Sequence, residues 1–229
     1  MGAPGVGKGT QADLLNRRLR ACHLSTGDVF RGAGEGCELS PAMKEAVGYM
    51  RRGELVPDST VWEMVRERKA CLHCGGGFIL DGFPRTIGQA ESLKKFMDGE
   101  GLALSAVVNY ELPFAEIVAR LSGRRTCEKC KAVYHVSERP PQIEGKCDRC
   151  DGKLLVREDD RPESIRVRLD AYERCTAPLI EFYQNSGLLV SVEAKGSPDE
   201  IFETTFTQLE DRRVRQVAQM AWVSLEDHC

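Results

Sequence analysis

The chain has 229 residues, of which 41% are hydrophobic and 29% are charged, and its formal net charge is −3. This composition is typical of a globular protein and is sufficient for one main domain with insertions. The small negative charge excludes the basic surface that a nucleic-acid-binding protein needs, and no apolar run approaches the roughly 18 residues of a membrane-spanning helix. We therefore expect neither nucleic acid nor a membrane among the partners of this chain.

A glycine-rich loop stands at the start of the chain, where residues 2–10 read GAPGVGKGT. Glycines at positions 2, 5, 7 and 9 reach the positive-φ conformations that let backbone N–H groups surround phosphate oxygens, and the helical pattern from Gln11 would add the positive end of a helix. Lys8 would reach the β- and γ-phosphates of a nucleotide, and Thr10 would be the hydroxyl beside Mg²⁺. Because Gly9 separates Lys8 from Thr10, the loop is a variant of the strict pattern. A flexible glycine-rich terminus is the alternative.

Short apolar runs and helical patterns alternate along the rest of the chain. Buried strands are expected at 21–24, 78–80, 106–110 and 188–192. Helices are expected near 29–31, at 41–52, and from residues 58, 113, 161 and 198 onward. Such alternation predicts an α/β fold with a mostly parallel sheet flanked by helices.

Two further features suit a phosphate-binding protein. Asp81 ends an apolar run, and a carboxylate at the C-terminal end of a strand near a phosphate loop is placed to hold Mg²⁺ or its waters. Arg120 and Arg124 are one helical turn apart in the helix expected from Pro113, so both should lie on one side of it. Their mutual repulsion is tolerable if phosphates lie between them. The alternative is an exposed basic face of the helix.

Four of the ten cysteines have the spacing of a metal site. Cys127, Cys130, Cys147 and Cys150 follow the pattern C-x₂-C-x₁₆-C-x₂-C, which lies within the range for tetrahedral zinc. Four thiolates leave no open coordination position, so the Zn²⁺ would be structural, in a segment with few apolar residues for a core. Two disulfides are the alternative, and the spacing does not distinguish zinc from iron. We favour zinc and a reducing compartment.

Five motifs, in this order, resemble those of one family. They are the loop at 2–10, LSTGD at 24–28, LDGFPRT at 80–86, GRR at 123–125 and TAPLI at 176–180. Their wording and spacing are similar to those of the adenylate kinases and related nucleoside monophosphate kinases, from residue 2 to about residue 198. The resemblance implies a P-loop NTPase-type fold with ATP, AMP and ADP as partners. The implied reaction is MgATP + AMP to two ADP.

The resemblance also implies roles for individual residues. Positive charge at the transferring phosphate would come from Lys8, Arg85, Arg120, Arg124, Arg157 and Arg168. ATP would contact Gly5, Val6, Gly7, Lys8, Gly9, Thr10, Arg120, Arg124, Val133, Tyr134 and Gly196. AMP would contact Thr26, Gly27, Arg31, Glu54, Leu55, Val56, Gly82, Phe83, Pro84, Arg85, Gln89, Arg157 and Arg168. Magnesium would be held by Thr10 and Asp81. Asp159 and Asp160 would be hinge residues or would form salt bridges that orient the arginines.

Three functional parts follow from the same resemblance. A core domain would comprise residues 1–24, 54–122 and 161–211, an AMP-binding helical lobe 25–53, and a zinc-binding lid 123–160. Residues 212–229 form a tail beyond the family pattern. We expect a cytoplasmic monomer, or an organellar protein if the natural chain begins earlier. A GTP:AMP phosphotransferase on the same scaffold and an inactive nucleotide-binding protein are the alternatives.

The sequence departs from the family at its first residues. Members have several apolar residues before the phosphate loop, which form a central strand, whereas only Met1 precedes Gly2 here. Four or five buried aliphatic side chains would contribute roughly 6–15 kcal/mol. That sum is similar to the whole stability of a domain, about 5–15 kcal/mol. We therefore expect poor folding of the chain as written, and a misassigned start rather than a functional short form.

Overall fold

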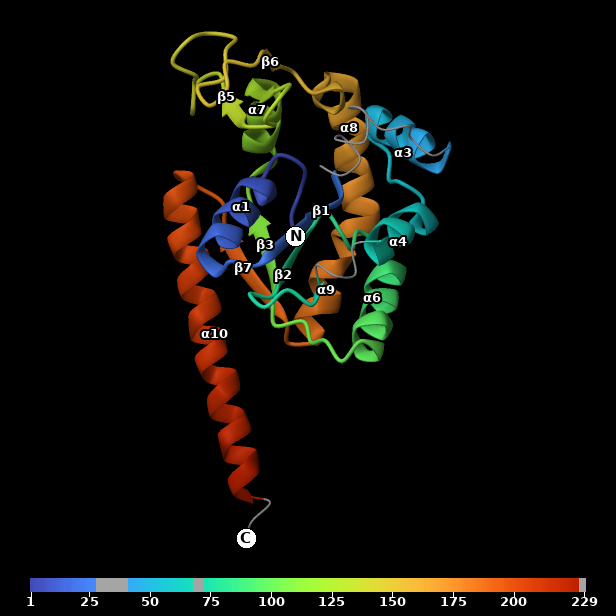
Figure 1. Cartoon of the computed structure of the whole chain (residues 1–229), viewed down its shortest axis with the longest axis vertical. Coiled ribbons are helices and arrows are strands. Elements are labelled where there is room, and N and C mark those ends of the chain that lie inside the picture. Colours follow the sequence, from blue (N-terminus) through green and yellow to red (C-terminus); the bar gives the residue numbers. More distant parts are fainter. Residues whose placement is uncertain (28–40, 68–71, 227–229) are drawn as a thin grey trace.

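The computed structural model describes residues 1–27, 41–67 and 72–226, with side chains for all of these except 41–45 and 214–226. Figure 1 shows the arrangement of the helices and strands. In the first half of the chain these are α1 Lys8–Leu19, β1 Cys22–Ser25, α3 Pro41–Arg52, α4 Asp58–Glu67, β2 Phe78–Asp81 and α6 Ile87–Gly99. In the second half they are β3 Val107–Glu111, α7 Phe114–Gly123, β4 Arg124–Cys127, β5 Val133–His135, β6 Leu154–Leu155, the 3₁₀ turn η1 Glu158–Asp160, α8 Pro162–Ala171, the π-turn η2 Tyr172–Thr176, α9 Pro178–Asn185, β7 Leu189–Glu193 and α10 Pro198–Glu226.

The predicted alternation of strands and helices is confirmed. The four predicted strands correspond to β1, β2, β3 and β7, each within one residue at either end. The helices predicted from residues 41, 58 and 198 are α3, α4 and α10. The helix predicted near 29–31 lies outside the described residues. None of the helices in the described ranges combines the length and the apolar character needed to span a bilayer.

The core strands are parallel, as predicted for an α/β fold. β1 pairs with β2, with Leu24 opposite Leu80, and β3 pairs with β7, with Tyr110 opposite Val192. Within the described part of the chain these are two separate pairs of strands. A third, antiparallel sheet with the order β5-β4-β6 forms the top of the molecule in Figure 1. α10 packs on α1 and β7 near its start and then extends past the other elements.

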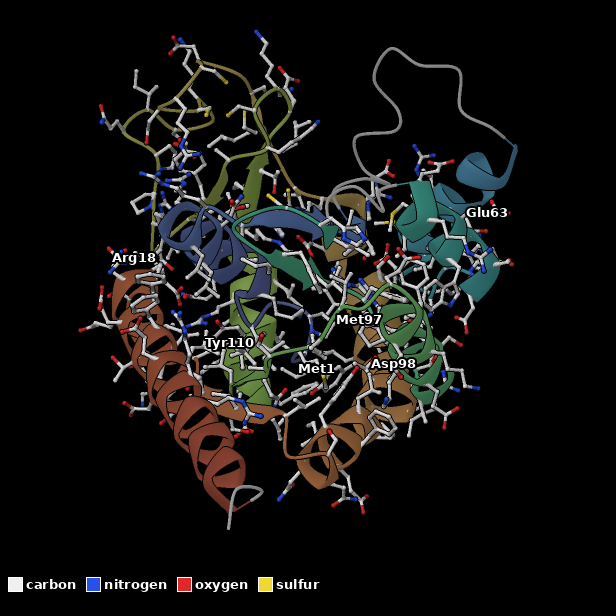
Figure 2. The ribbon with its side chains drawn as sticks, turned by 60° about the horizontal axis from the view of Figure 1, so that its bottom comes forward. Met1, Arg18, Glu63, Met97, Asp98 and Tyr110 are labelled. Atoms are coloured by element: carbon white, nitrogen blue, oxygen red, sulfur yellow. The ribbon has the colours of Figure 1, made fainter. Side chains whose placement is uncertain are left out.

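Met1 occupies the end of the space between the two pairs of parallel strands. Its amine donates a hydrogen bond to the Val108 carbonyl oxygen, and the Tyr110 N–H donates to the Met1 carbonyl oxygen at 3.1 Å. Two such bonds on either side of Asn109 are the pattern of a parallel bridge. Figure 2 shows Met1 between Tyr110 of β3 and Met97 of α6. The backbone of Met1 therefore continues the β-ladder of β3 and leads directly into the phosphate loop.

β2 is less buried than an internal strand of a parallel sheet should be. All four of its residues are only partly buried, although such strands are normally covered on both faces and paired on both edges. Part of each facing strand, 78–81 of β2 and 107–108 of β3, lines one cavity. This cavity lies between the two pairs of parallel strands.

Candidate functional site

The phosphate loop bends at glycines that no other residue could replace without strain. Gly2, Gly5 and Gly7 have φ angles of +125°, +86° and +103°. A Cβ on Gly5 would lie 2.7 Å from Leu121 Cγ, so the loop also lies too close to α7 for a side chain there. The prediction of the same role for Gly9 is wrong, because Gly9 lies inside α1 and has no positive φ.

Lys8 starts α1 and reaches back into the loop. Its Nζ donates hydrogen bonds to the Gly2 carbonyl oxygen at 2.8 Å and to the Ala3 carbonyl oxygen at 2.7 Å. The pKa of Lys8 is lowered to about 7, mainly by burial and also by nearby guanidinium groups such as that of Arg85, against the opposing effect of the Asp81 carboxylate. A bound phosphate would reverse this balance and favour the ammonium form, because an adjacent anion raises the pKa of an amine.

Asp81 lies at the C-terminal end of β2 with two cations beside it. Burial opposes ionisation of Asp81, but the nearby His23 imidazole and the charge of Lys8 keep the pKa of Asp81 below its usual range. His23 Nε2 is 3.9 Å from Asp81 Oδ2, and His23 Nδ1 is 3.4 Å from Asp13 Oδ1. Despite burial, these two carboxylates raise the pKa of His23 to about 9. Asp81 is therefore a charged carboxylate beside the loop, next to the first turn of α1 that carries Thr10.

Asp160 holds two of the predicted arginines together. Arg124 donates through Nε to Asp160 Oδ2 at 2.7 Å and through Nη2 to Asp160 Oδ1, while Arg168 Nη1 donates to the same Oδ1 at 2.9 Å. Arg168 also contacts Asp159 Oδ2 at 3.1 Å. The Asp160 side chain is completely buried, so its charge is compensated only by these neighbours. The predicted salt bridges from Asp159 and Asp160 are confirmed.

The prediction that Arg120 and Arg124 lie one turn apart in the same helix is wrong. α7 ends at Gly123, and Arg124 is the first residue of β4. A Cβ on Gly123 would lie 2.1 Å from His135 Nε2, so the tight contact between α7 and β5 requires glycine where the helix gives way to the strand. Both arginines nevertheless line the same cavity.

This cavity has a volume of about 1740 Å³ and includes the space between β2 and β3 described above. It brings together the loop and most of the cationic side chains that the sequence singled out. Its lining includes Gly5, Val6, Gly7, Lys8, Gly9, Thr10, Asp81, Arg85, Arg120, Arg124, Val133, Tyr134, Arg157, Arg168 and Gly196. Two of the other arginines have specific partners: Arg120 Nε lies 3.7 Å from Glu138 Oε2, and Arg157 Nε donates to Thr126 Oγ1 at 2.8 Å.

A second, small cavity of about 30 Å³ adjoins the first. Its lining contains eight of the residues predicted to contact AMP, namely Thr26, Gly27, Glu54, Leu55, Val56, Gly82, Arg85 and Gln89. Gly82 and Arg85 line both cavities, and Arg85 Nε donates to the Gly82 carbonyl oxygen at 2.7 Å. Phe83 lines the larger cavity and also packs edge-on against Trp62 in the core. Arg31 lies outside the described residues.

The four predicted metal ligands converge in the antiparallel sheet region. Their sulfur atoms all lie within 4.8 Å of one another, with Cys127 Sγ 3.5 Å from Cys150 Sγ and Cys130 Sγ 3.4 Å from Cys147 Sγ. These separations are too long for disulfides and suit a tetrahedral metal site, where zinc–sulfur bonds of about 2.3 Å place the sulfurs roughly 3.8 Å apart. The donor set therefore fits zinc.

Tyr134 and Gly196, which were both predicted to contact ATP, lie in surroundings that differ from each other. The Tyr134 ring is buried, and its hydroxyl accepts a hydrogen bond from the Asp148 N–H at 2.9 Å. Its side chain thus belongs to the core around the cysteines, and only its backbone remains for a nucleotide. Gly196 has a φ of +102° in the turn between β7 and α10.

Two polar side chains near the site were not predicted from the sequence. His23 was included only in an apolar strand, and Asp58 only in the stretch 54–58 that was expected to meet AMP largely through its backbone and to lead into a helix. Both contact predicted site residues, His23 as described above and Asp58 by accepting a hydrogen bond from Gln89 Nε2. A buried histidine in an otherwise apolar strand was the available signal for His23. No local pattern pairs Asp58 with a residue 31 positions later.

Comparisons with known proteins agree with this geometry. A family model described as "Adenylate kinase" matches residues 1–188. Curated relatives named adenylate kinase include those of Thermodesulfovibrio yellowstonii, 47% identical over 93% of this chain and 98% of the relative, and Carboxydothermus hydrogenoformans, 48% identical over 88% and 94%. That of Desulforamulus reducens is 49% identical over 84% of this chain and 89% of the relative. Because the family model covers most of the chain and these relatives are nearly half identical to it, the chain belongs to the adenylate kinase family.

Proposed function

We propose that the chain catalyses the reversible transfer of the γ-phosphoryl group of MgATP to AMP, which gives two ADP. The observation that carries the proposal is the junction of the two cavities. The larger one contains the phosphate loop and Lys8, the smaller one is lined by the residues predicted to contact AMP, and Arg85 lines both. A phosphate held at Arg85 would therefore face a nucleotide held in the loop.

The transfer is a direct displacement between the two substrates. A phosphate oxygen of AMP forms a bond to the γ-phosphorus of ATP, and the bond from that phosphorus to the β,γ-bridging oxygen breaks, so that the electron pair leaves with ADP. No protein side chain needs to form a covalent bond. The protein positions the two phosphates and neutralises their charge, which are the main contributions to such reactions.

Each cationic group has a proposed part in this displacement. Lys8 and the loop N–H groups hold the β- and γ-phosphates, and Arg85 holds the AMP phosphate. Arg120, Arg124, Arg157 and Arg168 surround the transferring group. Asp160 keeps Arg124 and Arg168 in one arrangement, so their donors need little reorganisation when a phosphate arrives.

Thr10 and Asp81 are the proposed residues for Mg²⁺. A hydroxyl at the start of α1 and an ionised carboxylate at the end of β2 are the oxygen ligands that this ion prefers. When bound with ATP, the ion neutralises charge on the β- and γ-phosphates. His23 supports this role of Asp81 by keeping the carboxylate charged.

The proposed lid and AMP-binding lobe are the segments 123–160 and 25–53, with the remaining residues up to 211 as the core. Closure of the lid over ATP would exclude water from the transferring group and so limit hydrolysis. Val133, the Tyr134 backbone and Gly196 would lie beside the ATP base. We propose that the protein acts as a monomer in a reducing compartment such as the cytoplasm, where four free thiolates are available.

The purified protein should contain about one zinc ion per chain, because four thiolates at these distances saturate a tetrahedral ion. Replacing Cys147 with serine should remove the metal and make the segment 128–156 sensitive to proteases. The change Cys175→Ser, at a free cysteine in η2 outside the cluster, should leave both properties unchanged. Elemental analysis and limited proteolysis provide the readouts. Substoichiometric metal together with oxidised cysteines in the native protein would reverse the assignment.

A panel of donors and acceptors tests the proposed reaction. With AMP as acceptor, the value of kcat/KM should be higher for MgATP than for MgGTP, and removal of Mg²⁺ should abolish turnover. The GTP:AMP phosphotransferase considered from the sequence is not favoured, because the curated relatives reported above are named adenylate kinases. A clear preference for GTP over ATP would contradict the proposed donor.

A further inference from the structure

Gln89 lies in the first turn of α6 with a fully constrained side chain. Thr86 caps this helix, and its Oγ1 accepts a hydrogen bond from the Gln89 N–H at 3.2 Å. Gln89 is only 3% exposed, yet it lines the small cavity whose walls contain the residues predicted to contact AMP. A buried amide at the wall of a cavity is suited to recognise a base by paired hydrogen bonds.

Both ends of this amide have partners of fixed hydrogen-bond character. The Arg85 backbone N–H donates to Gln89 Oε1 at 2.7 Å, and Gln89 Nε2 donates to Asp58 Oδ1 at 2.5 Å. A backbone N–H can only donate, and an ionised carboxylate can only accept. A rotated amide would place two acceptors together at Asp58 and two donors together at Arg85. The orientation of the Gln89 amide is therefore determined by its partners.

We propose that Asp58 is a specificity-determining positioning residue, which fixes the Gln89 amide in the orientation that selects adenine over 6-oxopurines in the acceptor nucleotide. This inference rests on the proposed function, because it assumes that the base of the acceptor lies against Gln89. Asp58 acts through Gln89 and is itself the first residue of α4, so the selection depends on the contact between α4 and α6.

The chemistry of the bases explains the selection. After the two contacts described above, Nε2 still has one proton to donate and Oε1 one lone pair to accept. Adenine offers a matching pair, since its N1 accepts and its 6-amino group donates. Hypoxanthine and guanine present the reverse pair, an N1–H donor and an O6 acceptor. With the amide fixed, a 6-oxopurine would leave buried donors and acceptors unpaired, and such sites reject the wrong ligand strongly.

Loss of the carboxylate should release the amide. In the variant Asp58→Ala only the Arg85 N–H would still favour the present orientation, and rotation would cost less than the mismatch with a 6-oxopurine. In Asp58→Asn both amides could rotate together, because asparagine can donate or accept. The second variant keeps the size of the side chain and protects the test against misfolding of the first.

The test compares AMP with inosine monophosphate, which differs only at the Watson–Crick edge and lacks the 2-amino group of GMP. For each protein kcat/KM is measured with both acceptors, and the ratio is taken so that the folded fraction cancels. We expect the AMP preference of the native protein to fall at least about tenfold in Asp58→Ala and by a smaller factor in Asp58→Asn. Glu63→Ala removes a different carboxylate from α4 and should leave the ratio unchanged (Figure 2).

Three outcomes would overturn the proposal. An unchanged ratio in both Asp58 variants would mean that Asp58 only stabilises α4, and an equal fall in Glu63→Ala would mean that any loss of charge on this helix has the same effect. Competition binding of AMP against inosine monophosphate gives the same ratio without turnover. A native protein that binds AMP selectively but transfers no phosphate would contradict the proposed function and leave this assignment intact, whereas binding without selection would overturn the assignment.

Discussion

Replacing Lys8 with alanine should reduce kcat for ADP formation by about a thousandfold, because loss of one preorganised charge at a developing anion costs roughly 10²–10³ in kcat and Lys8 also positions the loop. In the structure its Nζ is buried and hydrogen-bonded to the Gly2 and Ala3 carbonyl oxygens. The measurement is the steady-state rate of AMP-dependent ADP formation. The melting temperature should change little, because the lost hydrogen bonds are offset by removal of a buried amine.

The variant Lys94→Ala is a matched control, which tests whether the loss of a lysine outside the site also lowers the rate. Lys94 lies on the exposed face of α6, where it forms an ion pair with Asp98 at 2.7 Å. Lys94→Ala should therefore retain nearly the full rate. Near-normal turnover in the Lys8 variant, or an equal loss in the Lys94 variant, would contradict the role of Lys8. Arg85→Ala should give a loss comparable with that of Lys8→Ala, because Arg85 lines both cavities.

Joining five apolar residues, such as Ile-Val-Leu-Leu-Ile, ahead of Met1 should raise the melting temperature by at least about 10 °C. The added segment would extend the parallel bridge that Met1 already makes with β3 and would fill the apolar space beside β2. Four buried aliphatic side chains stabilise by roughly 6–12 kcal/mol. For a chain of this size each 1 kcal/mol corresponds to about 2–4 °C.

The matched control carries five polar residues, such as Ser-Asn-Thr-Asn-Ser, ahead of Met1 in place of the five apolar ones. It should leave the melting temperature within about 2 °C of that of the chain as written, since polar side chains gain nothing from burial in an apolar space. Thermal unfolding followed by circular dichroism gives both values. Equal melting temperatures for the two extended variants would show that the space between the strand pairs does not accept a strand. The apolar extension should also raise kcat, because it would hold the phosphate loop more rigidly.

The general fold was predictable because its signals are local. Apolar runs of three to five residues marked β1, β2, β3 and β7, and the proline at position 198 marked the start of α10. The cysteine spacing likewise predicted a cluster that the structure brings within 4.8 Å. The order of the motifs was sufficient to recognise the family.

Other features depend on contacts between distant parts of the chain and left no local signal. Arg124 was assigned to a helix because its spacing from Arg120 fits one turn, but the contact of Gly123 with His135 ends the helix one residue earlier. The pairing of His23 with Asp81 joins two strands, and that of Asp58 with Gln89 joins two helices. Sequence periodicity describes one element at a time, so it cannot predict which polar groups meet between elements.

The proposed phosphoryl transfer from ATP to AMP can be followed directly with a labelled phosphate. ATP carrying a labelled γ-phosphate is mixed with unlabelled AMP, Mg²⁺ and the chain as written, and the products are separated. We expect the label to appear in ADP and two ADP to form for each ATP consumed. The concentration of inorganic phosphate should stay low with or without AMP. Label released only as inorganic phosphate, or no transfer by a chain that is folded and binds both nucleotides, would contradict it.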